Sequence, residues 1–384
     1  MNPRWTHVTL GEEVKLLSGG TPKKSQTGYW DGDIPWVSSG EMVQRRISDT
    51  HLRVTDEGAE NGTRLIPEKT VLTVVRGMSL AKEFRVAITQ REMTFNQDLK
   101  ALVPSDKLDS EFLFYYLLSQ NDAIRDSATE ASHGTKKLET RVLQDWPLPL
   151  PCHDEQARIV SALSAYDDLI ENNMRRIKLL EESARLLYRE WFVRLRFPGH
   201  EHTRIVNGVP EGWEPSKIGD LLLKFRRKKK IKKDDFLEEG EIPCVDQSVS
   251  FIGGYTDDAE SCHTEPLPLV VFGDHTRILK FVNFPFASGA DGTQLLYPNK
   301  AGISVEWFYF ALQSVDLSNY FYARHFKFLK AEELLIPPPL LVNQFTTFAR
   351  PNLAMIERLR MQNDSLSKAR DLLLPKLMSG EIAA

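Results

Sequence analysis

The most regular pattern of apolar positions in the chain lies between residues 152 and 197, a stretch without glycine or proline. Apolar side chains recur there at alternating steps of four and three residues, with Asn173 as the polar member of the series. This heptad spacing, sustained for about five heptads, predicts a coiled-coil helix over residues 152–197. The predicted seam consists of Ile159, Leu163, Tyr166, Ile170, Asn173, Ile177, Leu180, Ala184, Leu187 and Trp191.

The alternative is a helix that packs only on its own globular lobe. About 40 helical residues at ~1.5 Å each span ~60 Å, more than the width of a lobe of about 150 residues, so the coiled coil is favoured. A polar residue in the seam, such as Asn173, lowers stability but fixes the register of the two helices.

A second and more polar seam falls at about 352–378, within a predicted helical region over residues 340–384. One such helix alone has no surface against which to bury its apolar stripe, so we expect the two helices to pair. In a chain that runs lobe, helix, lobe, helix, the simplest pairing is antiparallel, with the lobes at opposite ends of a rod. The second seam consists of Ile356, Leu359, Asn363, Leu366, Arg370, Leu373 and Leu377.

The segments before each helix have a different pattern. Short β-like runs such as VLTVV (71–75) and PLVVFG (268–273) alternate with turn signals, and one amphipathic helix is expected near the end of each segment, around 110–126 in the first. The predicted fold is α+β: two mixed α/β domains over residues 1–151 and 213–339, separated by the two-helix coiled coil, with a linker over 198–212.

These two domains repeat one another in sequence. GDIPWV at 32–37 returns as GEIPCV at 240–245, an offset of 208 (240 minus 32). The other matches keep their order along the chain, which predicts an internal duplication with pseudo-twofold symmetry. They are Trp5 with Trp213, Leu10-Gly11 with Ile218-Gly219, VVRG (74–77) with VVFG (270–273), DSEFLFYYLL with ISVEWFYFAL, PLPLP before Gln156 with IPPPL before Gln344, and SARLLYREWF with KARDLLLPKLM.

Composition narrows the class of protein. A chain of 384 residues, 41% hydrophobic and 27% charged, has the composition of a soluble protein of two to three domains. No apolar run approaches the roughly 20 residues that a membrane helix needs, and no secretory signal is visible. The three scattered cysteines predict neither a zinc site nor disulfides, and are typical of reduced thiols in a cytoplasmic protein.

Motifs for catalysis are missing from the sequence. Gly-Gly-Thr-Pro at 19–22 is not followed by GK[ST], and there is no GxGxxG after a strand and no HExxH. Phe95-Asn96-Gln97-Asp98 lacks the two prolines of the adenine-methyltransferase tetrapeptide that it otherwise suggests. We therefore expect no catalytic residue, no metal ligand and no cofactor bound by this chain.

Basic and amide side chains remain as candidates for nucleic-acid contact, since they bind phosphates and the edges of guanine and adenine. With a net charge of −4 and a pI of about 6.2, any such surface must be a local patch. RRKKKIKK at 226–233 overlies the lysine-containing loop 17–25 at the offset of 208, although a solvated charge run is the commoner interpretation. The candidates are Lys23, Lys24, Arg45, Arg46, Arg76, Lys82, Arg85, Asn96, Gln97, His133 and Lys136 in the first domain, and Arg226, Arg227, Lys228, Lys229, Lys230, Gln247, His275, Arg277, Lys280, Arg324, His325 and Lys327 in the second. His133/Lys136 and His325/Lys327 fall at matching places after the short helix.

The ordered set of motifs resembles the specificity subunit of type I restriction-modification systems over essentially the whole chain. It comprises Trp5 followed by Leu10-Gly11, the GxIPxV strand, PLPLP before Glu155-Gln156, and their second copies. The second copy departs from the first at two points, with Asn343 in place of Glu155 and Cys244 in place of Trp36.

This resemblance implies that each domain is a target recognition domain for one half of a bipartite, asymmetric site on double-stranded DNA. It implies that the coiled coil sets the spacer and docks two modification (methyltransferase) subunits, which bind S-adenosylmethionine and methylate adenine. Two restriction subunits would add ATP- and magnesium-dependent translocation and cleavage. The chain itself would be a non-catalytic cytoplasmic subunit. The alternative is a non-catalytic coiled-coil scaffold that presents two ligand-binding lobes; a self-sufficient methyltransferase or nuclease is disfavoured by the missing motifs.

Overall fold

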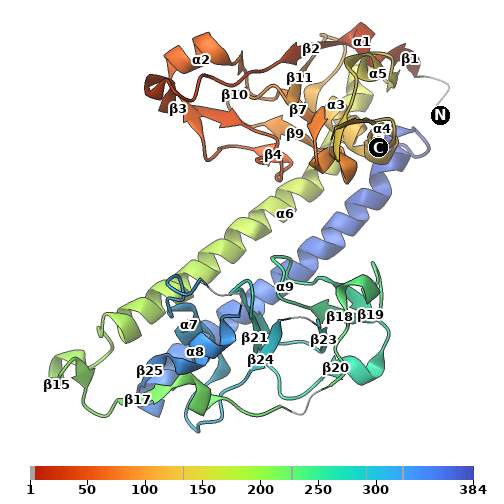
Figure 1. Ribbon diagram of the computed structural model, residues 1–384. Coiled ribbons are helices and arrows are strands. Elements are labelled where there is room, and N and C mark those ends of the chain that lie inside the picture. The colour runs from red at the N-terminus through yellow and green to blue at the C-terminus, as the bar shows by residue number, and fades with distance from the viewer. Residues whose placement is uncertain (1–4, 133, 226–227, 291, 322–323) are drawn as a thin grey trace. The chain divides into compact units, whose positions relative to one another are not determined.

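The structure is a computed structural model that describes residues 5–132, 134–225, 228–290, 292–321 and 324–384 (Figure 1). It divides into two compact units: unit 1 comprises Met1–Glu171 and Asn363–Ala384, and unit 2 comprises Asn172–Gln362. The division falls inside both long helices, whereas the sequence pattern placed the domain limits at their ends. Each helix therefore contributes one half to each unit.

Unit 1 contains a five-stranded sheet, a four-stranded sheet and two smaller ones. The five-stranded sheet has the order β2 (Val14–Ser18), β11 (Leu99–Pro104), β7 (Val71–Val74), β9 (Val86–Thr89), β4 (Arg46–Ile47). The four-stranded sheet has the order β5 (Arg53–Val54), β3 (Trp30–Val37), β10 (Met93–Phe95), β6 (Leu65–Ile66). The smaller sheets are β12 (Thr129–Ser132), β13 (Thr135–Lys137), β8 (Arg76–Gly77), and β1 (Thr6–Thr9) with β14 (Pro147–Leu150). The short helices are α1 (Leu10–Glu13), α2 (Asp56–Gly62), α3 (Ser110–Ser119), α4 (Asn121–Asp126) and α5 (Thr140–Gln144).

Unit 2 repeats this plan with fewer strands. Its four-stranded sheet has the order β19 (Gly254–Thr256), β18 (Ile242–Val245), β23 (Phe286–Ser288), β20 (Cys262–His263). A three-stranded sheet has the order β22 (Leu279–Val282), β21 (Leu269–Gly273), β24 (Thr293–Leu296). Two pairs complete it, β17 (Glu214–Lys217) with β25 (Glu333–Ile336) and β15 (Ile205–Val206) with β16 (Val209–Pro210), together with α7 (Val305–Gln313) and α8 (Phe326–Ala331).

The duplicated GxIPxV segment forms equivalent strands in the two units. β3 pairs in parallel with β10, with Trp36 opposite Thr94, and β18 pairs in parallel with β23, with Cys244 opposite Ala287. On either side, both strand pairs are extended by antiparallel neighbours in the same order. Because sheet order depends on contacts between distant segments, this agreement is independent of the sequence match and confirms the predicted duplication.

The helix expected near the end of each domain is buried on all sides, not amphipathic. Six consecutive residues of α3, from Phe112 to Leu117, are buried, and in α7 the residues from Val305 to Leu312 are buried. A helix that is apolar all round belongs in a core. Each begins at a side-chain cap: the Asp109 carboxylate accepts from the backbone N–H groups of Glu111 and Phe112, and the Ser304 hydroxyl accepts from that of Trp307.

The two predicted long helices are present as α6 (His153–Tyr188), continued by a π-helical turn over Arg189–Val193, and α9 (Pro339–Met378). The predicted second seam begins at 352, after Pro351, but the helix runs through this proline. Phe345, Ala349 and Leu353 are buried on both sides of it. Packing of this face into the core of unit 2 stabilises the helix where Pro351 removes a backbone hydrogen bond.

Contacts within each unit show that α6 and α9 run antiparallel. In unit 1, Asn363 Nδ2 donates to the carbonyl oxygen of Ile170 at 3.4 Å. In unit 2, Arg360 Nη2 lies 2.6 Å from Glu181 Oε1, and Asn173 Nδ2 donates to the side chain of Gln362 at 3.3 Å. Of the predicted seam, Ile159, Leu163, Asn173, Ala184, Ile356, Leu359, Arg370 and Leu377 are buried, and Tyr166, Ile170, Ile177, Leu180, Leu187, Trp191, Asn363, Leu366 and Leu373 are partly buried.

Candidate nucleic-acid interface

In unit 2, several predicted side chains meet in the loops after β18 and β21 and at the start of α8. The loop cluster of unit 2, defined as residues 246–248, 274–277 and 324–327, is tied together by backbone groups. Asp274 accepts at its carbonyl oxygen from the His325 N–H (2.8 Å) and at Oδ1 from the Phe326 N–H (2.7 Å). The Gln247 side-chain oxygen accepts from the His275 N–H at 3.0 Å. These hydrogen bonds fix the loops, while His275, Arg277, Arg324 and Lys327 are exposed on them.

In unit 1, the corresponding loops bring together Arg76, Gln97 and Lys136. β13 pairs with β8, so that Lys136 lies opposite Gly77, beside Arg76. Gln97 is exposed, and its side-chain oxygen accepts from the Thr21 hydroxyl at 2.6 Å, which joins the loop after β2 to the loop after β10. The Arg76 N–H also donates to the Asp98 carbonyl oxygen at 3.3 Å, so the backbone segments that carry Arg76, Gln97 and Lys136 lie next to one another in unit 1.

Lys280 and Asn96 are two of the three predicted contact residues that are buried in the described part of the chain, His325 being the third, and the structure contradicts their assignment. The Lys280 side chain is 4% exposed, and its ammonium donates to the carbonyl oxygens of Ser250 and Phe251 (3.4 Å) and lies 3.6 Å from Asp246 Oδ1. Burial lowers the pKa of Lys280, and Asp246 opposes this shift. Asn96 is 5% exposed and its side-chain oxygen accepts from the Asp98 N–H at 3.1 Å. Both groups complete loops inside the protein and cannot read bases.

Arg46 is also used internally. Its side chain is 17% exposed and pairs with Asp168 and, at 3.8 Å, with Glu171, both on α6 in unit 1. Arg45 is more exposed and lies 3.9 Å from Asp371 of α9. Instead of the predicted contact to DNA, Arg46 therefore makes ion pairs that attach β4 to α6.

The described part of the basic run, residues 228–233, lies at the place equivalent to the loop 17–25, as predicted. The Ile231 N–H donates to the carbonyl oxygen of Ser288 on β23. In the same way, the Gly20 N–H donates to the carbonyl oxygen of Phe95 on β10, the equivalent strand of unit 1. The Lys228 ammonium donates to the Cys262 carbonyl, and that of Lys229 pairs with Asp258 at 2.7 Å. These lysines therefore hold the loop in shape.

The remaining candidates fall into three groups. Lys23, Lys24 and Lys82 are exposed on loops of unit 1. Arg85 is partly buried, with an ion pair to Glu83 at 3.4 Å. His133, Arg226 and Arg227 lie outside the residues that the structure describes.

The predicted match of His133/Lys136 with His325/Lys327 is wrong in one respect. Lys136 lies on a strand, β13, whereas Lys327 lies in helix α8. The structural counterpart of α8 is α5, because Gly11 contacts Gln144 at the end of α5 in the way that Gly219 contacts Lys330 in α8. His325 itself is 5% exposed.

Two further findings concern the described part of the chain as a whole. Among those residues, no helix is long and apolar enough to cross a membrane. Nor do they contain a group of three or more His, Cys, Asp or Glu side chains arranged to hold a metal ion.

Comparison with known proteins finds relatives of this chain in one family. Residues 2–182 match the family model described as the type I restriction modification DNA specificity domain. Over 98% of its length the chain is 26% identical to the type I restriction enzyme MjaIX specificity subunit of Methanocaldococcus jannaschii, of which it covers 93%. The chain is similar over nearly its whole length to a specificity subunit of a type I restriction-modification system. The resemblance inferred from its motifs is thereby confirmed.

Further specificity subunits are similar to this chain. The Escherichia coli EcoR124I/EcoR124II specificity subunit is 31% identical over 163 residues, which are 42% of this chain and 40% of that protein. The crystal structure of a type I restriction-modification S subunit from M. genitalium superposes with a TM-score of 0.61 at 19% identity, covering 98% of this chain and 96% of that one. This last comparison supports the fold: two mixed α/β domains with long helices.

Residues that sequence reasoning missed lie where distant segments meet. Arg370 was identified only as a seam position, yet it pairs with Asp167. Lys224 and Lys330 line a cavity in unit 2, although they are about a hundred residues apart in the chain. A pairing of this kind leaves no local signal in the sequence.

Proposed function

We propose that the chain confers DNA sequence specificity on a type I restriction-modification complex, with each unit contacting one half of a bipartite site on double-stranded DNA. The observation that carries this proposal is the repetition of one strand order in two units whose exposed loop residues differ. Unit 1 carries Arg76, Gln97 and Lys136, whereas unit 2 carries His275, Arg277 and Lys327. A common frame with different donors favours two different half-sites, since side-chain donors and acceptors discriminate base pairs in the major groove.

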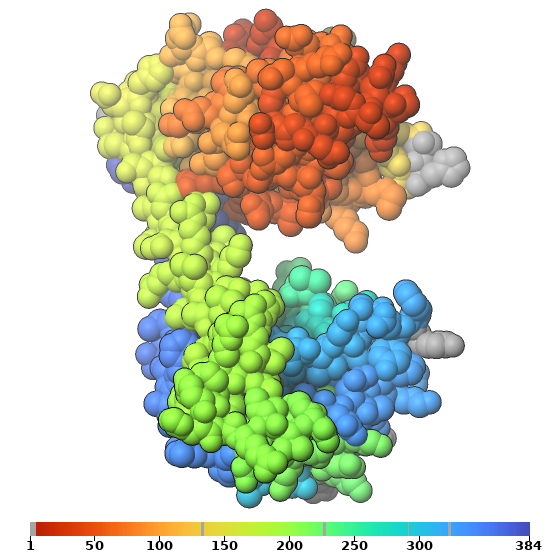
Figure 2. All heavy atoms as spheres, turned by 90° about the vertical axis from the view of Figure 1, so that its left-hand side faces the viewer, coloured from red at the N-terminus to blue at the C-terminus, as the bar shows by residue number. Residues whose placement is uncertain are grey.

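Modification and restriction subunits are the proposed protein partners, two of each, and the complex would act in the cytoplasm. Long helices with exposed apolar side chains offer a surface for such partners. On α6, Leu179 is 69% and Leu186 46% exposed, and on α9, Leu372 is 70% exposed. In the space-filling view, the end of α6 and the segment after it, in yellow-green and green, lie at the surface of unit 2 (Figure 2).

The chain is the non-catalytic specificity component. S-adenosylmethionine, ATP and magnesium would be bound by the partner subunits, where methyl transfer and translocation take place. We propose further that the number of heptads in α6 and α9 sets the spacer between the half-sites, because both helices belong to both units.

The test is to co-express the chain with its neighbouring modification subunit and to map methylated adenines across a genome. The expected result is a single bipartite motif with two dissimilar halves. Replacing the exposed residues of the unit 2 loop cluster should alter one half only. Methylation without a common motif, or a motif that does not depend on this chain, would favour the alternative of a scaffold that binds other ligands.

A further inference from the structure

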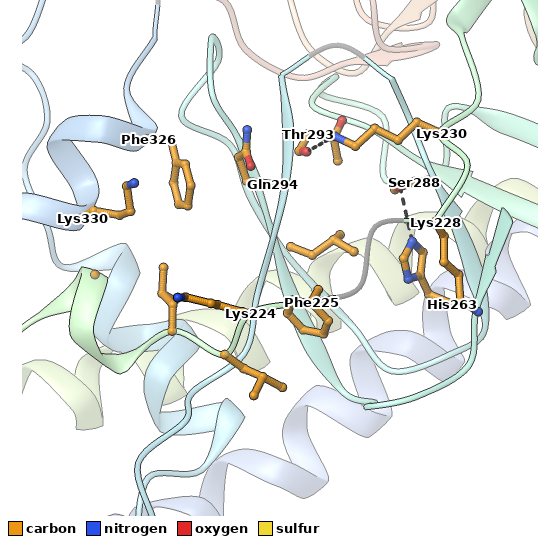
Figure 3. Close-up of a pocket in the computed structure, with 14 residues that line it drawn as sticks. Lys224, Phe225, Lys228, Lys230, His263, Ser288, Thr293, Gln294, Phe326 and Lys330 are labelled. Carbon is orange, nitrogen blue, oxygen red and sulfur yellow. Dashed lines mark hydrogen bonds between the residues drawn. The ribbon is translucent and has the colours of Figure 1, made fainter.

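Unit 2 contains a cavity of about 760 Å³ at the open edge of β24 (Figure 3). In unit 1 the equivalent edge is covered, because β2 pairs with β11 along five positions from Val14 to Ser18. In unit 2 the corresponding segment follows β24 only briefly: Leu222 bridges to Pro298, and the Leu223 N–H donates to the Tyr297 carbonyl. The segment pairs again at Ile231, with Ser288 and Gly289 at the end of β23 in the four-stranded sheet. The cavity lies where unit 1 has a strand.

The lining of this cavity is rich in cationic side chains. Lys224, Lys228, Lys230 and Lys330 line it, and none of the described lining residues is Asp or Glu. Lys230 Nζ donates to the carbonyl oxygen of Thr293 at 2.8 Å, and Lys228 Nζ to that of Cys262. Because the Cys262 carbonyl is neutral, it orients the Lys228 ammonium group without cancelling its charge. Figure 3 shows Lys230 and Thr293 on one side of the cavity and Lys330 with Phe326 on another.

One buried hydroxyl in the cavity lacks a partner. The Thr293 side chain is 1% exposed, and its Oγ1 has no hydrogen-bond partner among the described residues. An unsatisfied buried hydroxyl is destabilising, so a ligand that accepts its proton would be favoured. His263, across the cavity, has its pKa lowered by burial and then by Lys228 and Lys230, as expected for an excess of positive charge.

We propose that this cavity binds a phosphate group of the DNA backbone, with Lys224, Lys330 and the Thr293 hydroxyl as donors. The proposal rests on the proposed DNA-specificity function. It adds an anchoring site to unit 2, at the edge of β24; in unit 1 the equivalent edge is covered by β2. The position fits, because Gly292, beside Thr293, adjoins Gln247 and His275 of the loop cluster. DNA in contact with that cluster would pass beside the cavity.

An extended acidic peptide is the competing occupant, since an open strand edge can accept another strand. The structure favours phosphate for two reasons. Lys230 already occupies the Thr293 carbonyl oxygen, an acceptor that a docking strand would need. The remaining donors, ammonium and hydroxyl groups, suit the oxygens of a phosphate.

The test uses the full chain co-expressed with its modification subunit. Affinity for a fluorescent duplex of random sequence is measured by anisotropy from about 50 to 200 mM KCl. The variant K224Q/K330Q should lower the steepness of log K against log salt by about 1, which corresponds to roughly a 3-fold change over this range. The matched control K232Q/K233Q removes the same charge from the exposed run outside the cavity and should have a smaller effect.

A second variant, T293V, removes the hydroxyl without changing charge. It should weaken duplex binding several-fold while raising the melting temperature, because the unsatisfied group is gone. Salt dependence of K224Q/K330Q equal to that of the control would overturn the proposal. The proposal would also be overturned if K224Q/K330Q bound the duplex as well as the unmodified chain does but no longer bound a polyglutamate peptide. If the unmodified chain gave no methylation motif, the proposed function itself would fail, whatever the cavity variants did.

Discussion

Arg370 stands in the seam of α9 and is matched by a carboxylate from α6. Its guanidinium pairs with Asp167, and the side chains of the two residues are 8% and 12% exposed. The Tyr115 hydroxyl donates to Asp167 Oδ2 at 2.7 Å, and Asp371 lies 2.8 Å from the guanidinium on the solvent side. Burial lowers the pKa of Arg370, but Asp167 and Asp371 together raise it by more, so the pKa lies above its usual value.

The substitution R370M should destabilise unit 1 because it leaves the Asp167 carboxylate buried without its cation. Breaking a buried pair by removing one partner costs about 3–5 kcal/mol. The double variant R370M/D167L removes both charges and should cost much less, since apolar replacement of a whole buried pair is often nearly neutral. D371N, whose side chain is 53% exposed, is the matched control and should cost less than about 1 kcal/mol.

Hydrogen exchange followed by mass spectrometry measures this locally in the full chain. Peptides from 363–378 should lose roughly 100-fold or more of their protection in R370M, while peptides from 339–362, in unit 2, should keep theirs. If R370M and R370M/D167L lost protection equally, the role of Arg370 would be packing and the electrostatic argument would be refuted.

Three further predictions follow from the structure. G19A should lower the melting temperature of unit 1 by an amount equal to about 2 kcal/mol or more, because its Cβ would lie 2.2 Å from the Phe95 carbonyl oxygen, whereas G28A, with nothing within 4 Å, should be neutral. Burial and neighbouring lysines lower the pKa of His263 from 6.5, so the unfolding free energy of unit 2 should fall as pH drops below about 6.5. Urea midpoints measured against pH should show this fall in the unmodified chain and a smaller fall in H263Q. The same pH dependence in both proteins would contradict the prediction. Deleting one heptad from α6 and the facing heptad from α9 should shorten the spacer of the methylation motif by about 3 base pairs, from ~10.5 Å of helix, and leave both half-sites unchanged; altered half-sites would count against a spacer role.

The sequence predicts the parts of the fold that depend on local periodicity. Heptad spacing locates both long helices, and the ordered repeats locate equivalent strands, because each signal repeats along the chain. The predicted seam of the second helix begins only at 352, although the buried face of α9 continues before Pro351; local propensity opposes a helix at this proline, and burial of residues such as Phe345 in unit 2 outweighs that.

The candidate site was harder to predict than the fold. Lys280 and His275 are both polar side chains near strand ends, yet one is buried against carbonyl oxygens and the other exposed. Which of them faces solvent depends on the loop after β18, which is distant in sequence. The lysine-lined cavity likewise arises because one segment fails to pair with β24, and a strand that is missing leaves no pattern to recognise.

The way in which α6 and α9 are divided between the units has a consequence for synthesis. Leu374, Leu377 and Met378 belong to the same hydrophobic core as Trp5 and Ile159, so unit 1 is built from both ends of the chain. On the ribosome, every residue of unit 2 emerges before the last turns of α9 do. Unit 2 can therefore complete its core first, and unit 1, although translated first, must wait for the end of the chain. A ribosome that stopped just after Gln362 would release a molecule that lacks part of the core of unit 1 and none of the residues of unit 2.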